Sequence, residues 1–72
     1  MPSMNFTLEC EQEDDERWLA EVPELPGVLA YGASRSQAMA KAEVLALRVL
    51  ADRIEHGEAR AHDIRISLAA AA

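Results

Sequence analysis

The sequence predicts an α+β domain of β-β-β-α-β order, with an antiparallel three-stranded meander, a fourth strand and one helix packed on one face of the sheet. The prediction depends on short stretches of alternating apolar and polar residues, which lie on both sides of a single long stretch with helical periodicity. The chain has 72 residues, the size of one small domain. We assign its core to residues 4–68 and an alanine tail to residues 69–72.

The first three strands are predicted from the two-residue period of a strand with one solvent-facing side. In "MNFTLECEQ", residues 4–12, apolar and polar side chains alternate, and "RWLAEV", residues 17–22, alternates again. The acidic "EDDE" between them has no glycine, which predicts a looser hairpin connection than a two-residue Asn-Gly turn. The short "VLAYG", residues 28–32, completes the meander.

A rigid turn is predicted between the second and third strands, in "VPELPG". Pro23 and Pro26 fix the backbone angle φ and cannot donate a hydrogen bond to a strand ladder. Pro26 and Gly27 suit the two central positions of a type II turn, in which glycine takes the positive φ. The segment therefore ends one strand and re-aims the next.

A helix with a signal at each end is predicted over residues 34–57. Ser34 and Gln37 fit a capping box, in which the serine caps the first turn and the glutamine reaches back. Gly57 is suited to end the helix in the left-handed conformation. Much of the apolar face is alanine, so the helix can lie close to a sheet. This face contains Ala38, Ala42, Leu45, Ala46 and Val49, flanked by Met39 and Leu50.

One further alternation, in "DIRISL", predicts a fourth strand, followed by the alanine tail. A strand-helix-strand return lets this strand join the sheet beside the first strand, with a right-handed crossover if the two are parallel. One helix leaves the other sheet face uncovered, and Leu19, Leu29 and Tyr31 are the apolar residues expected there. An exposed apolar face predicts self-association or a partner surface.

The negative charge is concentrated at one end of the sequence. The formal net charge is −6, and residues 1–24 carry eight acidic residues against the single basic Arg17. An acidic surface repels phosphate backbones and attracts basic proteins. We therefore expect no direct DNA binding and favour a basic protein partner. The alternative is that these carboxylates only keep an exposed hairpin soluble.

No set of residues has the spacing of a metal or catalytic centre. The acidic stretch 9–16 lacks the glycine and the oxygen register of a calcium loop, and Cys10 with His56 and His62 does not have zinc spacing. Cys10 alternates with apolar residues, which indicates a core position. We expect no metal, no cofactor and no enzymatic activity.

A cytoplasmic location is expected. The lone cysteine excludes an intrachain disulfide and is typical of a reducing compartment. No apolar run approaches the ~20 residues that a membrane span needs. The N-terminal "MPSMNFTLE" lacks the basic and apolar segments of a signal peptide.

The stretch "WLAEVPELPGVLAYGASRSQAMAKA", residues 18–42, resembles the HicB-type antitoxin family, and the likeness extends over residues 6–57. The recurrent pattern of that family is a tryptophan or tyrosine strand that runs into P-x-L-P-G, then a short strand, G-x-(S/T) and an Ala-rich helix. The residues at these positions are Trp18, Val22, Pro23, Leu25, Pro26, Gly27, Gly32, Ser34, Ala38 and Ala42.

This resemblance implies a partial RNase H-like fold and an antitoxin that binds and blocks a small, basic, mRNA-cleaving toxin of the HicA type, without catalysis. Many antitoxins of this type continue into a C-terminal DNA-binding domain. This chain stops after "ISLAAAA", so the resemblance implies a stand-alone member without one. The motif residues Pro23, Pro26, Gly27, Gly32 and Ser34 are expected to shape the fold.

The partner-binding residues that we expect are exposed acids. These are Glu9, Glu11, Glu21 and Glu24, and Trp18 is either a hydrophobic anchor or a core residue. An alternative function from another class is an orphan homo-oligomeric binding or scaffold module that has no toxin partner. In that case a dimer or higher oligomer would form through the uncovered sheet face.

Overall fold

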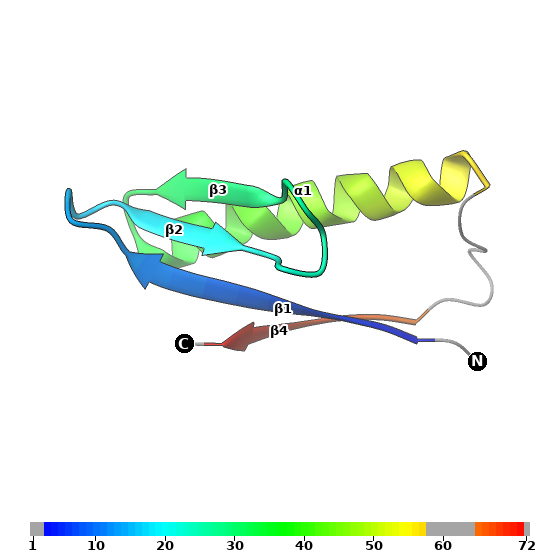
Figure 1. Ribbon diagram of the computed structural model, residues 1–72, viewed down its shortest axis with the longest axis horizontal. Helices are drawn as coiled ribbons and strands as arrows, with labels where there is room; N and C mark the ends of the chain where they lie inside the picture. Colours follow the sequence, from blue (N-terminus) through cyan, green and yellow to red (C-terminus); the bar gives the residue numbers. More distant parts are fainter. Residues whose placement is uncertain (1–2, 58–64, 72) are drawn as a thin grey trace.

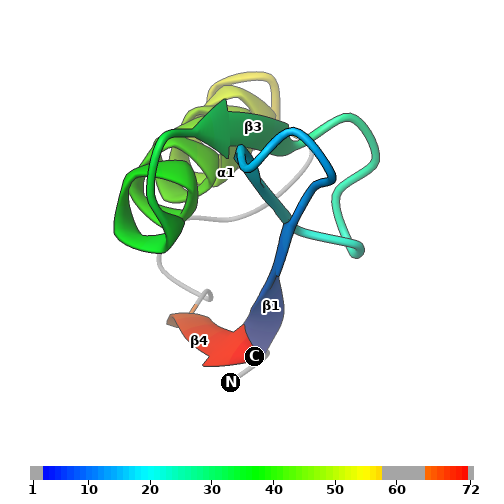
Figure 2. The ribbon, with the colours of Figure 1, turned by 90° about the vertical axis from the view of Figure 1, so that its left-hand side faces the viewer.

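The computed structural model describes residues 3–57 and 65–71, with side chains described for residues 5–57. Its elements are β1 (Ser3–Gln12), β2 (Trp18–Glu21), β3 (Leu29–Gly32), α1 (Arg35–Glu55) and β4 (Arg65–Ala71). The strands form one sheet of order β3-β2-β1-β4, and α1 lies on one side of it (Figures 1 and 2). The predicted α+β class, element order and antiparallel meander are therefore confirmed.

The fourth strand pairs in parallel with β1, so that Ser3 lies opposite Arg65 and Glu9 opposite Ala71. The predicted return of this strand to the side of the first is confirmed. β4 runs on through Ala71, however, so it includes residues 69–71, which the sequence analysis leaves in a tail. Because a ladder is made of backbone hydrogen bonds, a run of alanines can pair in a sheet although it has no alternating pattern by which the sequence could reveal a strand. Ile64 and Ala72 lie outside the described residues.

The hairpin between β1 and β2 is longer than a two-residue turn, as predicted. The Glu13 N–H donates to the Arg17 carbonyl oxygen (2.7 Å), and the Glu16 N–H donates to the Glu13 carbonyl oxygen (3.0 Å). Glu16 has a φ of 69°, the left-handed conformation that glycine usually supplies in such a loop. The Asp15 carboxylate accepts from the Arg17 backbone N–H (3.2 Å) and from its Nε (2.6 Å), and these hydrogen bonds lower the pKa of Asp15.

The turn between β2 and β3 contains two consecutive β-turns. The Leu25 N–H donates to the Val22 carbonyl oxygen and closes the first turn, and the Val28 N–H donates to the Leu25 carbonyl oxygen and closes the second, each at 3.0 Å. The Val22 N–H donates to the Val28 carbonyl oxygen, also at 3.0 Å, and joins the two ends of the segment. Each β-turn has a proline at its second position, where the fixed φ is already suitable. Gly27 has a φ of 87°, which confirms the predicted type II turn. The double turn carries Leu25 into the core, where it is 1% exposed.

Both ends of α1 have the predicted signals. The Gln37 N–H donates to Ser34 Oγ (3.1 Å), which is the expected N-cap. The side chain of Gln37 reaches back to the N–H of Ala33 (2.6 Å), one residue before the position that a capping box predicts. At the other end Gly57 has a φ of 74°, and its N–H donates to the Ile54 carbonyl oxygen (3.2 Å). The left-handed ending is confirmed.

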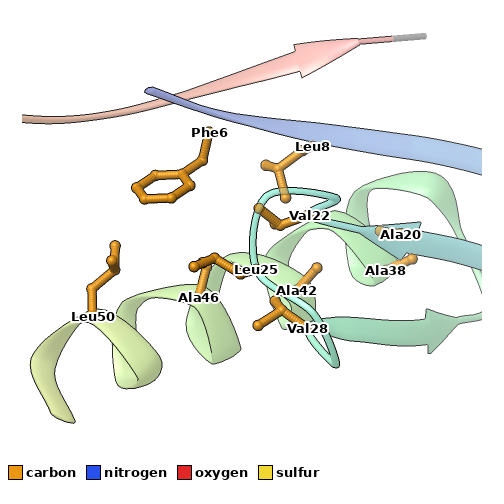
Figure 3. Packing of buried hydrophobic residues seen from close by; sticks show 10 residues of the cluster. All are labelled: Phe6, Leu8, Ala20, Val22, Leu25, Val28, Ala38, Ala42, Ala46 and Leu50. Atoms are coloured by element: carbon orange, nitrogen blue, oxygen red, sulfur yellow. The ribbon is translucent and has the colours of Figure 1, made fainter. Parts of the chain in front are cut away.

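The core lies between α1 and the inner face of the sheet, where side chains from β1, β2, the proline turn and α1 converge (Figure 3). The helix contributes a row at every fourth position, in which three of four residues are alanines that are fully buried. The helix lies very close to the sheet at Gly32, where an added Cβ would lie 2.5 Å from the backbone N of Ala38. The buried cluster consists of Phe6, Leu8, Ala20, Val22, Leu25, Val28, Ala38, Ala42, Ala46 and Leu50.

Replacing Gly32 with alanine should destabilise the fold. The new methyl group would meet helix backbone, which cannot rotate away, and overpacking of this kind typically costs about 1–3 kcal/mol. Gly27→Ala is the comparison variant, because an added Cβ there meets nothing within 4 Å and only the positive φ opposes it; we expect a loss of about 1 kcal/mol. Urea unfolding measures both. A Gly32→Ala chain as stable as wild type would contradict the close helix contact.

Replacing Glu16 with glycine should stabilise the fold by about 0.5–1 kcal/mol. Glycine removes the strain of the left-handed conformation, and this gain exceeds the extra backbone entropy that glycine loses on folding. Glu16→Gln removes the same charge and keeps the strain, so it serves as the control. The free energy of unfolding from urea titration should rise for the glycine variant alone. Equal rises in the two variants would assign the effect to charge.

Candidate protein-binding face

The sheet face opposite α1 carries the candidate site, which we call the outer face. Because side chains alternate along a strand, the neighbours of the core residues point to this side. β1 contributes Thr7, Glu9 and Glu11, β2 contributes Leu19 and Glu21, and β3 contributes Leu29 and Tyr31. Figure 2 shows α1 on the other side of the sheet, beside β3.

Three carboxylates form an acidic cluster on this face: Glu9, Glu11 and Glu21. Glu9 lies directly opposite Glu21 in the antiparallel ladder, and like charges at such positions destabilise a sheet. Glu9 and Glu11 are exposed, and Glu21 is half-buried. Within residues 5–57 none of the three takes part in an ion pair or a side-chain hydrogen bond. The cluster is therefore a concentration of negative charge that the described part of the chain does not neutralise.

An apolar strip, made of Leu19, Leu29 and Tyr31, lies beside the acidic cluster. Leu19 is opposite Tyr31 in the β2–β3 ladder, and Leu29 and Tyr31 are 44% and 39% exposed. The Arg17 guanidinium carbon lies 4.4 Å from the centre of the Tyr31 ring, a cation–π contact. The predicted position of these three apolar residues on the face away from the helix is confirmed. Apolar area next to unpaired charge is a combination typical of protein interfaces.

Two of the expected contact residues have structural roles. Trp18 is half-buried and packs against the core on the helix side, so it is not part of the outer face. Glu24 lies in the proline turn, and its Oε1 accepts the backbone N–H of Thr7 (3.1 Å). The ladder between β1 and β2 ends where Glu9 lies opposite Glu21. Thr7 lies beyond that end of the ladder, and the Glu24 carboxylate accepts its backbone N–H in place of a β2 carbonyl oxygen. Its own backbone N–H and that of Thr7 lower the pKa of Glu24.

Cys10 is half-buried and packs against the core, as its position in the alternating pattern predicts. Within the described residues, no three His, Cys, Asp or Glu side chains are grouped so that they could hold a metal ion. In the same part of the chain, no helix is both long enough and apolar enough to cross a membrane.

Sequence reasoning missed the contact of Arg17 with Tyr31 and the hydrogen bond from Thr7 to Glu24. Neither has a periodic signal, because Arg17 borders a loop and Glu24 belongs to a turn 17 positions away from Thr7. Comparison of the chain with protein-family models, with curated proteins and with solved structures found no match. The outer face is therefore interpreted from its own residues.

The Glu24 hydrogen bond should make stability depend on pH. The pKa of this carboxyl is lower in the folded chain than its ordinary value of 4.5, so its stabilising contribution is complete above that value and is lost as the pH falls through the lowered pKa. Glu24→Gln should therefore have a lower urea midpoint than wild type at pH 7, and the difference should shrink in acid.

Glu24→Asp is the matched control for this experiment, because it keeps the charge on a side chain one methylene shorter. If the hydrogen bond to Thr7 is the cause, the aspartate variant should also lose stability at pH 7. A Glu24→Asp chain that follows the wild-type pH curve would instead assign the effect to charge alone.

Proposed function

We propose that this chain is a non-catalytic, HicB-like antitoxin that binds a small, basic, mRNA-cleaving toxin of the HicA type through the outer face. The observation that carries the proposal is the acidic cluster beside the apolar strip, on the sheet face that α1 does not cover. The resemblance of residues 18–42 to the HicB motif supplies the kind of partner. A partial RNase H-like fold belongs to the same proposal, and the parallel pairing of β4 with β1 in the β-β-β-α-β order supports it.

Inhibition is by occlusion. A protein that cleaves RNA holds phosphates with Lys and Arg side chains, and much of its affinity for RNA comes from these contacts. The carboxylates of the acidic cluster would take the place of phosphates on that surface and exclude the RNA. Charge complementarity mainly raises the rate of association and the specificity. The apolar strip would supply buried area that slows dissociation.

The same face is poorly suited to self-association. If two copies met through it, two acidic clusters would be brought together, and like charges across an interface cost several kcal/mol. A basic partner would remove the repulsion between Glu9 and Glu21, which the free chain retains. We therefore prefer the antitoxin to a scaffold that assembles through this face. Because the toxin acts on mRNA, the complex would reside in the cytoplasm.

The binding test is co-expression with any small basic protein that is encoded beside this chain, followed by purification through a tag on that protein and measurement of growth. Wild type should co-purify and relieve growth arrest. Neutralising the acidic cluster with Glu9→Gln, Glu11→Gln and Glu21→Gln should weaken binding about tenfold or more, mainly through slower association. Arrest should then return.

The matched control removes the same number of charges away from the outer face, with Asp14→Asn, Glu16→Gln and Glu55→Gln. These side chains are exposed in the hairpin loop and at the end of α1, so this variant should bind and protect like wild type. Equal weakening in both triple variants would show that net charge, and not the outer face, drives binding. The absence of any small basic neighbour that binds the chain would overturn the proposal.

A further inference from the structure

The side of α1 away from the sheet has a second row of apolar residues, exposed or half-buried, that is not part of the core formed by the described residues. Its members are Ala40, Val44, Leu47, Ala51 and Ile54, which we call the outer helix row. Val44 and Leu47 are 47% and 46% exposed, more than any other large apolar side chain in the described part of the chain. The core row of the same helix lies on its other side, at Ala38, Ala42, Ala46 and Leu50.

The spacing of the outer helix row is that of a coiled coil. Its members are separated alternately by four and three residues, which is the heptad spacing of about 3.5 residues that keeps a seam facing a partner helix. A β-branched residue at one seam position with leucine at the next favours a parallel coiled coil of two helices. Val44 and Leu47 fit this pattern. The helix has 21 residues, which is a length of about 30 Å.

Charges beside the row indicate that a second copy of this chain is the partner. Lys41, Arg48 and Glu55 flank one side of the row, and Glu43 flanks the other. In a parallel pair, the residue just before one seam position faces the residue just after the next seam position on the partner helix, five positions later in the sequence. Glu43 of each copy would then face Arg48 of the other, which gives two symmetric ion pairs. An antiparallel pair that matches Val44 with Leu47 would instead bring Lys41 close to Arg48 of the other copy, and like charges would repel.

We propose that two copies of this chain associate through the outer helix row, with their α1 helices parallel and Glu43 of each copy facing Arg48 of the other. This interface lies on the other side of the molecule from the outer face, so both surfaces can be occupied at once. The homo-oligomer expected from the sequence would in this proposal form through the helix and not through the sheet face. The inference does not depend on the identity of any toxin. With the proposed function it gives a complex of two copies with two partners.

Sedimentation equilibrium of the full chain over a concentration series tests the association. Wild type should form a reversible dimer. Leu47→Gln and Val44→Gln should each weaken the dimer about tenfold or more, because each places a polar group in the seam. Both residues are already about half exposed, so the variants should fold, and circular dichroism checks this. Leu29→Gln is the matched control on the outer face and should leave the dimer intact.

Charge exchange and a disulfide test the orientation. Glu43→Arg should weaken the dimer, and adding Arg48→Glu should restore it. In a Cys10→Ala background, Val44→Cys should form a disulfide-linked dimer on mild oxidation, because symmetric seam positions of a parallel pair approach within the usual Cα separation of about 4.4–6.8 Å. In an antiparallel pair, by contrast, only a mixture of Val44→Cys and Leu47→Cys chains would crosslink.

Three results would overturn the proposal. The first is a monomer at every concentration. The second is a dimer that survives Leu47→Gln but is lost in Leu29→Gln, which would assign the interface to the sheet. The third is crosslinking only in the mixed sample, which would show antiparallel helices. Because no toxin is present in these experiments, none of these results depends on the proposed function.

Discussion

The close contact between α1 and the sheet is the constraint on which the rest of the structure depends. Gly32 leaves no side chain between β3 and the first turn of the helix, and the alanines at positions 38, 42 and 46 continue the contact along the helix axis. Small residues allow this short separation but bury little apolar area, so most of the larger core side chains belong to β1 and the proline turn. Phe6, Leu8 and Leu25 fill the space beyond the alanines. The proline turn is therefore part of the core as well as a connection.

A single helix on a four-stranded sheet makes the two faces chemically different. On the inner face the core side chains are apolar and buried or half-buried, and no buried side-chain polar atom among the described residues lacks a hydrogen-bond partner. On the outer face, Glu9 and Glu21 are held opposite each other by the register of the ladder. Register is set by the inward-facing apolar residues, since a slip of one residue would expose all of them. The core thus holds two like charges opposite each other, a repulsion that a cationic partner would relieve.

Local signals made most of the fold predictable, and long-range contacts limited the rest. Alternation and capping depend on neighbouring residues, so the strands, Ser34 and Gly57 were found from the sequence alone. Alternation also grouped Trp18 with Ala20, but it did not say how far the helix covers that side. The pairing of Glu9 with Glu21 depends on a hairpin loop in which Glu16 takes a position usually filled by glycine. Glu24 was predicted as a surface acid, because no periodic pattern reveals that its carboxylate caps a strand.

The distribution of charge decides where an acidic chain can meet a copy of itself. Most of the negative charge belongs to residues 1–24, whereas residues 25–72 carry six basic and five acidic residues. Repulsion between exposed charges fades beyond a Debye length of about 8–10 Å at physiological salt. Two copies can therefore approach through α1, where charges of both signs flank an apolar row, while their acidic clusters remain on the far side of each sheet. The helix that completes the core would in this way also keep the outer face free for a partner of opposite charge.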